Sequence, residues 1–274
     1  MTLAAFSVHE PTRAESPLLV EVPHAGLAVD PQSLASLIAP ARSLVRDADL
    51  YVDELYQDAP IEGATLLVAH VSRYVCDLNR SESDVDAAAV DGGGGRAAPH
   101  GLVWRTTTDD QPALGAPLPR SELTRRLRDF YRPYHDKIAE VLKRKRDRFG
   151  FALLLCAHSM PSRGRAGHAD PGRERADVVP GTRGRTSAAE SVIEVVDRLS
   201  NEFGWTVAHD EPYKGGYSTG HYGRPEEGVH AVQVELARRL YMDEATLLKR
   251  QKDFELTRSF CRRLVARLGA CTVG

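Results

Sequence analysis

Hydrophobic positions along the chain fall into short continuous runs that alternate with longer segments of helical spacing. The short runs are typical of buried strands and cover residues 17–22, 64–70, 73–78, 151–157, 205–208 and 230–237. Apolar residues at helical spacing predict helices over residues 31–46, 50–56, 119–149, 187–203 and 243–268. Strands that alternate with helices favour an α/β fold, here with a mixed, mostly parallel central sheet flanked by helices.

Local signals predict where two of these helices are interrupted or end. Pro133 should kink or divide the helix over 119–149, because proline lacks a backbone donor and clashes with the preceding turn. Ser187 can cap the helix that follows it, with Glu190 three residues later as its capping-box partner. Gly204 is the expected stop of the same helix.

Three segments lack periodicity and are expected to be irregular. Residues 1–16 read as a loose lead-in, 81–118 as a long loop and 160–187 as a second long loop rich in Gly, Arg and Pro. The first long loop carries the glycines Gly92–Gly95, which predict a flexible insertion. They form no phosphate-binding loop, because no Gly-Lys-Ser/Thr follows them. With no internal repeat, the chain is predicted to form a single domain over residues 1–274.

Charge and hydropathy exclude two classes of partner. The chain has 36 Lys and Arg against 38 Asp and Glu, a net charge of −2, so it offers no basic field to nucleic-acid phosphates. Its longest purely apolar run, residues 151–157, is far shorter than the roughly 20 residues that span a membrane. We therefore expect no nucleic-acid partner and no membrane association.

The N-terminal residues and the cysteines bear on the cellular compartment. Glu10 and Arg13 precede any apolar stretch, so we expect no secretory signal. The chain has no CxxC motif, and its cysteines are Cys76, Cys156, Cys261 and Cys271. They are expected to be buried thiols of a reducing compartment, which predicts a cytoplasmic protein.

Two histidines follow predicted strands, at the positions where α/β proteins place their sites. His24 comes after the first strand and His158 after the strand over 151–157. Imidazole is a common zinc ligand, and a catalytic zinc usually takes three protein ligands. The third ligand is expected from Asp47 or Asp49. A single histidine after a strand is more often a turn residue, and either aspartate could cap the next helix, but two histidines at equivalent strand ends favour a metal site.

Glu235 is the candidate catalytic carboxylate. It lies in the strand over 230–237, where Val232, Val234 and Leu236 share one face and Gln233 and Glu235 the other. A carboxylate in that position either faces solvent on an edge strand or serves chemistry. Beside a metal-bound water it could take the water's proton and pass it to a leaving amine.

Several polar groups could bind a substrate carboxylate. Asn79 and Arg80 end the run over 73–78, and the arginine fork suits a carboxylate. The alternative is a surface ion pair between Arg80 and Glu82 or Asp84, and the sequence leaves both open. Further donors are offered by Arg73 and by the glycine-rich loop over 212–225, which contains Gly216 and His221.

Taken together, these motifs resemble the N-formylglutamate amidohydrolase family. They occur in the family's order over about residues 17–250. They are VPHAG at 22–26, DAD at 47–49, VDELY at 52–56, SRYVCDLNR at 72–80, GLVW at 101–104, YRPYH at 131–135, AHS at 157–159, KGG at 214–216, HYG at 221–223, VQVEL at 232–236 and YMDE at 241–244.

The resemblance implies a fold of the zinc-dependent exopeptidase-like type and the hydrolysis of N-formyl-L-glutamate to formate and glutamate, a step of histidine degradation. It implies that His24 and His158 bind one Zn²⁺, or another divalent metal, and that Glu235 is the general base. Related carboxypeptidases take a Glu three residues after the first His, where this chain has Leu27. The carboxylate ligand is therefore expected elsewhere, and we favour Asp49 over Asp47.

The expected protein is thus a zinc-dependent amidohydrolase that acts on a small acyl-amino acid. His24, Asp49 and His158 would hold the metal, Arg73 would help to stabilise the oxyanion, and Asn79 and Arg80 would hold a glutamate carboxylate. Two alternatives stay open at this point. The first is a metal-dependent deacylase or carboxypeptidase-like enzyme for another N-acyl amino acid or peptide, and the second is a non-catalytic binding protein of the same fold.

Overall fold

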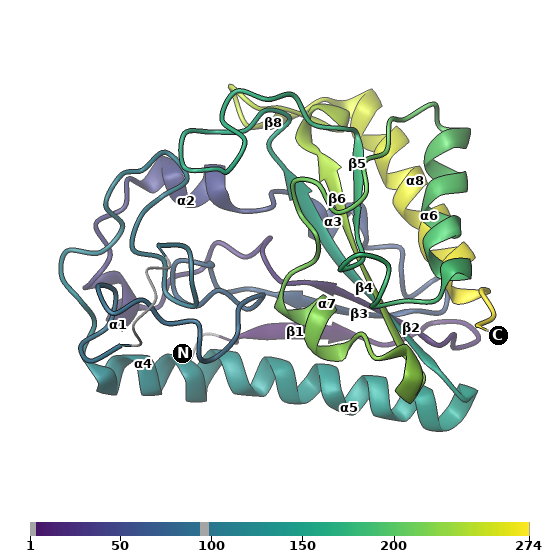
Figure 1. Cartoon of the computed structure of the whole chain (residues 1–274), viewed down its shortest axis with the longest axis horizontal. Helices are drawn as coiled ribbons and strands as arrows, with labels where there is room; N and C mark the ends of the chain where they lie inside the picture. Colours follow the sequence, from purple (N-terminus) through teal and green to yellow (C-terminus); the bar gives the residue numbers. More distant parts are fainter. Residues whose placement is uncertain (1–3, 94–98, 274) are drawn as a thin grey trace.

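A computed structural model describes residues 4–93 and 99–273 of the chain. Within these residues a six-stranded sheet has the order β1-β3-β2-β4-β6-β5 (Figure 1). Its strands are β1 (Phe6–His9), β2 (Leu18–Val22), β3 (Thr65–Ala69), β4 (Ala152–Met160), β5 (Val178–Gly181) and β6 (Val229–Ala237). The four inner strands pair in parallel and both edge strands pair antiparallel, which confirms the predicted mostly parallel sheet.

Helices cover both faces of this sheet. The helical segments are α1 (Pro31–Leu34), α2 (Ala41–Asp47), α3 (Val52–Leu55), α4 (Arg120–Arg126), η1 (Leu127–Tyr131), α5 (Arg132–Phe149), α6 (Glu190–Glu202), α7 (Tyr217–Tyr222), η2 (Pro225–Glu227), η3 (Arg238–Leu240) and α8 (Gln251–Gly269). Helices α4 and α5 pack on one face, and α3, α6 and α8 pack on the other (Figure 1). A small hairpin of β7 (Met242–Asp243) and β8 (Leu248–Lys249) precedes α8.

The central strands are apolar on both sides because both of their faces are covered. In β4, Leu153 and Leu155 join the core under α6 and α8, whereas Leu154 joins the core under α4 and α5. In β6 the predicted alternation is confirmed, since Val232, Val234 and Leu236 lie in the first of these cores. Gln233 and Glu235 point to the other side and are also buried, which places two polar side chains inside the protein.

Two predicted strands are wrong. Residues 73–78 form turns, in which the hydroxyl of Ser72 accepts a hydrogen bond from the amide of Tyr74. The polar Arg73 and Asp77 of this segment face the candidate site rather than a neighbouring strand. Residues 205–208 contribute only an isolated bridge between Val178 and Val207.

Strands were also missed in two of the segments expected to be irregular. The lead-in over 1–16 contains β1, which pairs with β3 and packs Phe6 and Val8 against the core under α5. The loop over 160–187 contains β5, which pairs with β6. Both strands are four residues long, which leaves too few positions for a clear alternation of apolar and polar residues.

The expected helix signals were partly right. The interruption near Pro133 takes the form of the π-helical turn η1, and Pro133 itself lies in the first turn of α5, where proline is tolerated. The capping box is wrong, because α6 begins at Glu190 and the Ser187 hydroxyl instead donates to backbone carbonyls of Thr182 and Ala231. Gly204 takes the expected left-handed conformation after α6.

Two of the predicted helices, those over 31–46 and 243–268, differ most from the structure. The segment over 31–46 divides into α1 and α2, with Pro40 at the cap position of α2. The final helix begins at Gln251 because the residues before it form the hairpin of β7 and β8. The part of the loop over 81–118 that the structure describes holds no helix and only isolated bridges. Of the glycine insertion, Gly94 and Gly95 lie outside the described residues.

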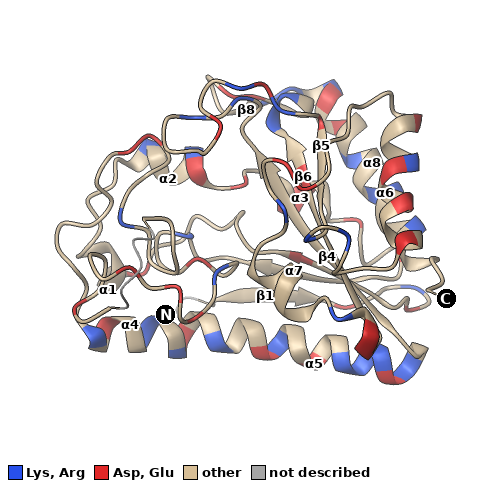
Figure 2. Ribbon diagram, in the orientation of Figure 1, with Lys and Arg blue, Asp and Glu red and all other residues tan. Residues whose placement is uncertain are grey.

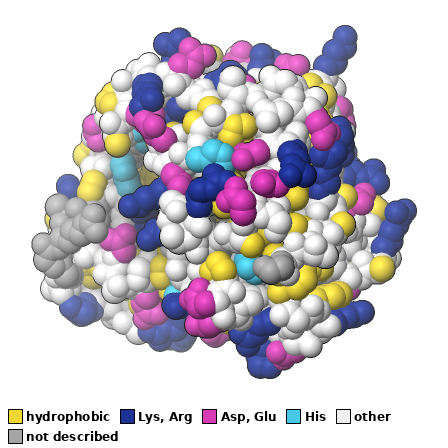
Figure 3. Space-filling view, turned by 45° about the vertical axis from the view of Figure 1, so that its right-hand side comes forward, with side chains coloured by type: hydrophobic (Ala, Val, Ile, Leu, Met, Phe, Trp, Pro, Cys, Tyr) yellow, Lys and Arg dark blue, Asp and Glu magenta, His cyan; other side chains and the backbone are white. Residues whose placement is uncertain are grey.

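The surface carries charges of both signs. Lys and Arg are interspersed with fewer Asp and Glu along α4 and α5 (Figure 2), and charges of both signs are intermingled on the face shown in Figure 3. Among the described helices, none is both long and apolar enough to span a membrane. Cys76, Cys156 and Cys261 are buried free thiols and Cys271 is half-buried, whereas the cellular compartment stays a prediction.

Candidate metal and catalytic site

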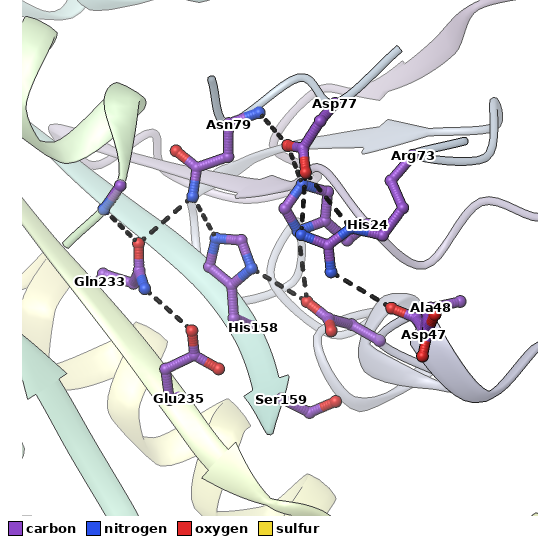
Figure 4. Close-up of polar contacts among 12 residues, drawn as sticks. His24, Asp47, Ala48, Arg73, Asp77, Asn79, His158, Ser159, Gln233 and Glu235 are labelled. Carbon is purple, nitrogen blue, oxygen red and sulfur yellow. Dashed lines mark hydrogen bonds and ion pairs between the residues drawn. The ribbon is translucent and has the colours of Figure 1, made fainter. Parts of the chain in front are cut away.

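The candidate site lies at the carboxyl ends of the inner strands, where the sheet meets the irregular segments. His24 follows β2, His158 lies near the end of β4, and Glu235 lies opposite His158 in the register of β6 (Figure 4). A cavity of about 560 Å³ opens at this edge and is lined by all three side chains. A cavity of this size is typical of sites for small molecules.

Asp49 joins the two histidines into one compact group. Its Oδ2 lies 2.9 Å from Nδ1 of His158 and 3.6 Å from Nδ1 of His24. The three side chains are buried, and one candidate ligand atom from each lies within 4.8 Å of the others. The amide of Asp49 also donates to the carbonyl of His24 at 2.9 Å, so the backbone itself ties the two loops together.

Asp47 is engaged elsewhere, which explains why it is not part of this group. Its carboxylate accepts hydrogen bonds from the Tyr74 hydroxyl at 2.5 Å and from the Thr108 amide at 3.1 Å, and it pairs with Arg165 at 2.8 Å. It also accepts from the Thr108 hydroxyl. Asp47 therefore holds the end of α2 to two loops, whereas Asp49 faces the histidines.

The donor set of this group fits a divalent cation of the zinc type. Two imidazole nitrogens and one carboxylate oxygen are the ligands that a catalytic zinc takes, with a further position left for water or substrate. His24 also has the outer carboxylate that accompanies metal-binding histidines, since its Nε2 lies 2.7 Å from Oδ1 of Asp77. Because a carboxylate only accepts, Nε2 carries a proton, which leaves Nδ1 as the nitrogen of His24 that would bind a cation.

A chain of amides links the second histidine to the catalytic candidate. Nδ2 of Asn79 lies 3.1 Å from Nε2 of His158 and donates to Oε1 of Gln233 at 3.3 Å. Gln233 in turn donates to Oε1 of Glu235 at 2.9 Å (Figure 4). The same Asn79 accepts from the amide of Ser218 at 3.0 Å, so its side chain is held from both ends.

Burial and neighbouring charges shift the pKa values of the carboxyl groups in this site in opposite directions. Burial raises the pKa of Asp49, but its hydrogen bonds to His158 and His24 outweigh burial and hold the pKa well below its usual range. Asp77 behaves likewise, because its attraction to His24 and Arg73 exceeds the effect of burial and lowers its pKa. Burial, helped by the nearby Asp49, raises the pKa of Glu235. A carboxyl with a raised pKa is suited to exchange protons near neutral pH.

Arg73 lies between the carboxylate of Asp77 and the ring of Trp104 in the cavity. Its guanidinium pairs with Asp77 at 3.0 Å, donates to the carbonyl of Asp47 at 3.2 Å and stacks 4.4 Å over the ring of Trp104. Trp104 donates from Nε1 to the same Asp77 carboxylate at 2.9 Å. Arg73 is thus fixed in orientation and lines the cavity.

Arg80 also lines the cavity, but its side chain is exposed. Glu82 pairs with Arg132 instead, and neither Glu82 nor Asp84 forms an ion pair with Arg80 in the described part of the chain. The Tyr131 hydroxyl donates to the carbonyl of Arg80 at 2.8 Å, which anchors the turn on η1. The surface-pair alternative is therefore not observed, and the guanidinium is available to an anion.

The structure brings Gly216 to the cavity but not His221. A side chain at Gly216 would collide with Asn79, since its Cβ would lie 2.2 Å from Nδ2 of that residue. His221 lies exposed in the last turn of α7, stacked on the ring of Tyr217 at 4.8 Å, and is not among the residues that line the cavity. The helical turn of α7 directs it away, so its predicted role in substrate binding has no support from its position.

Some cavity residues were not assigned a role from the sequence. Asp77 and Gln233 each lie two residues before a predicted site residue, Asn79 and Glu235 respectively. That spacing is the signal from which they could have been predicted. Arg165 and Tyr213 also line the cavity. They come from aperiodic loops, where nothing in the local sequence marks a side chain as part of a site.

Comparisons with known proteins agree on one family. The model of the N-formylglutamate amidohydrolase family matches residues 16–242. An N-formylglutamate deformylase of Pseudomonas aeruginosa is 37% identical over 262 residues, which cover 93% of this chain and 94% of the relative. A protein of the same name from Pseudomonas putida is 36% identical over 231 residues, with 83% and 82% covered.

Solved structures agree with the observed fold. The crystal structure of an N-formylglutamate amidohydrolase from Ralstonia eutropha matches with a TM-score of 0.90 and 30% identity, and the match covers 98% of both chains. A gene product of Agrobacterium tumefaciens shares the fold, with a TM-score of 0.68 and 18% identity over 96% of this chain and 94% of its own.

Proposed function

We propose that this chain, which belongs to the N-formylglutamate amidohydrolase family, hydrolyses N-formyl-L-glutamate to formate and L-glutamate. The observation that carries the proposal is the position of Glu235 beside the buried group of His24, Asp49 and His158, in a cavity lined with arginines. The formyl group and the glutamate of the proposed substrate are inferred from the names of the relatives.

His24, Asp49 and His158 would hold one divalent cation, and the mixed nitrogen and oxygen donors favour Zn²⁺. When bound, such a cation lowers the pKa of a coordinated water to about 7 and polarises a carbonyl oxygen. Asp77 orients the ring of His24, and Asn79 contacts the ring of His158. We propose that this arrangement is of the type found in zinc exopeptidases.

Glu235 would transfer a proton from the attacking water to the nitrogen of the leaving glutamate. Oε1 of Glu235 is occupied by the Gln233 amide, and among the described residues no hydrogen bond reaches Oε2. Oε2 therefore takes a proton from the attacking water while the water oxygen bonds to the formyl carbon. The same oxygen then delivers the proton to the glutamate nitrogen as the carbon–nitrogen bond breaks, so that formate and the free amine leave.

The arginines would orient the substrate and stabilise its developing charge. Arg73, fixed by Asp77 and Trp104, faces the cavity and supports the oxyanion formed from the formyl oxygen. Arg80 would hold the carboxylate nearest the scissile nitrogen, because its turn is joined through Asn79 to His158. A bound carboxylate positions the formyl carbon and so lowers the entropic cost of attack.

The test is to measure metal content and formate release on the same preparation of the full chain. We expect a stoichiometric divalent metal, release of formate from N-formyl-L-glutamate, and loss of that activity on chelation with recovery when Zn²⁺ returns. Cleavage of other N-acyl amino acids or peptides but not of formylglutamate would favour a different deacylase. A protein that binds formylglutamate but never cleaves it would contradict an enzymatic function.

A further inference from the structure

Besides Arg80, a second arginine on the cavity wall is not paired with an acid in the described part of the chain. Arg73, Arg165 and Arg238 each pair with an aspartate of the site, namely Asp77, Asp47 and Asp49. Arg183 forms no ion pair with any residue that the structure describes, and its guanidinium donates only to the carbonyl of Gly215, at 3.2 Å. An uncompensated guanidinium at a cavity wall is suited to a carboxylate ligand.

The side chain of Arg183 occupies a space shaped by two glycines. A Cβ at Gly220 would lie 3.1 Å from Cζ of Arg183, and a Cβ at Gly215 would lie 3.4 Å from its Cδ. The amide of Arg183 also donates to the carbonyl of Lys214 at 2.8 Å. The stem of the arginine is therefore fitted across the start of α7, which distinguishes it from a freely solvated surface side chain.

The backbone at Arg183 adopts a conformation that is uncommon for a residue with a side chain. Its φ of 56° lies in the left-handed region. The carboxylate of Asp210 holds this turn by accepting from the amide of Thr182 at 2.6 Å and from the amide of Gly184 at 2.8 Å. Strained positions of this kind cluster at ligand sites, because the surrounding contacts must maintain them.

We propose that Arg183 binds the side-chain carboxylate of the substrate and thereby sets a preference for acidic N-acyl amino acids. The inference rests on the proposed function and extends it to a specificity-determining residue. Arg80 and Arg183 are both exposed, but Arg80 adjoins Asn79, which is buried and contacts His158, whereas Arg183 contacts the backbone of Gly215. Asn79 and Arg80 thus suit the carboxylate near the scissile bond, and Arg183 suits the more distant one.

The experiment compares two substrates that differ only in that distant charge, N-formyl-L-glutamate and N-formyl-L-glutamine. In the Arg183→Gln variant we expect kcat/KM for formylglutamate to fall about 10- to 100-fold, mainly through KM, because a charge-assisted hydrogen bond is lost. The value for formylglutamine should hardly change. Arg183→Lys keeps the charge and should retain most of the preference.

Arg185 supplies the matched control. It lies in the same turn with a φ of 63°, but it pairs with Glu190 and is not among the residues lining the cavity. Arg185→Gln should leave the ratio of the two substrates unchanged. Gly220→Ala is a second variant that keeps Arg183 and shifts its guanidinium by roughly a few tenths of an ångström, because the added Cβ would lie 3.1 Å from Cζ, so it should weaken formylglutamate binding in the same direction but less.

The outcomes separate the inference from the proposed function. If Arg183→Gln and Gly220→Ala remain folded by thermal melting and keep the wild-type ratio, the inference is overturned. If Arg183→Gln does not fold, an unchanged ratio in Gly220→Ala overturns it alone. If the wild-type protein releases formate from neither substrate, the proposed function fails, and this result is independent of any variant.

Discussion

Nε2 of His24 donates to Oδ1 of Asp77 at 2.7 Å, inside the protein. The Asp77 carboxylate also accepts from Trp104 and Arg73, so its position is fixed from several sides. The contact sets the tautomer of the imidazole and directs Nδ1 of His24 toward Asp49. A residue outside the group of His24, Asp49 and His158 thus holds one of its members in the orientation that a divalent cation would need.

Replacing that carboxylate should weaken the metal site without removing a ligand. We expect Asp77→Asn to lower the metal affinity about 10- to 100-fold, because outer hydrogen-bond partners of metal-binding histidines contribute on that scale. The measurement is a competition titration against a chromophoric chelator. An affinity equal to that of the wild type would show that the contact with His24 has no role in metal binding.

The two neighbouring aspartates should respond differently to the same substitution. Asp49→Asn should abolish stoichiometric metal binding, because it alters a member of the ligand group. Asp47→Asn should keep the metal but lower the free energy of unfolding by roughly 3 kcal/mol, because it leaves the mostly buried Arg165 unpaired. Metal analysis and urea unfolding of both variants check this, and loss of metal from Asp47→Asn alone would reverse the assignment.

The buried carboxyl of Glu21 is expected to make the free energy of unfolding depend on pH. It is fully buried in β2, its Oε1 has no hydrogen-bond partner among the described residues, and burial raises its pKa. Above the ordinary pKa of a glutamate the unfolded chain releases this proton while the folded chain keeps it, so stability falls as the pH rises toward the raised value. This carboxyl therefore destabilises the fold at neutral pH.

We expect Glu21→Gln to stabilise the protein by on the order of 1–3 kcal/mol near neutral pH and by much less near the ordinary pKa of glutamate. Urea unfolding of both proteins across that pH range gives the difference. Glu140→Gln, at an exposed position of α5, is the control and should give no comparable trend. A gain of stability that is constant with pH would contradict the role of the buried charge.

The sequence allowed the central site residues to be predicted because their signals are local. The apolar runs of β4 and β6 place His158 and Glu235 near strand ends, and the register of the sheet then puts them opposite each other. No local signal separates Asp49 from Asp47, since both aspartates adjoin the same predicted helix. Only the contacts of Asp47 with Tyr74, Thr108 and Arg165 separate them.

What could not be predicted depends on tertiary contacts between loops. The fitted position of Arg183 requires a left-handed backbone and two glycines from a different segment, and no local pattern encodes that combination. His221 was included because it lies in a glycine-rich loop, but the short helix α7 turns it outward. The strand β1 was missed because its four residues form a strand only by pairing with β3.

The most direct test of the central claim is formate release by Glu235→Gln, measured together with its metal content. The substitution keeps the shape of the side chain and the histidine–aspartate group while removing the proton acceptor. We predict stoichiometric metal and turnover of N-formyl-L-glutamate reduced about 10²- to 10⁴-fold. A variant that keeps its metal and turns over formylglutamate at the wild-type rate would contradict the assignment of Glu235 as the general base.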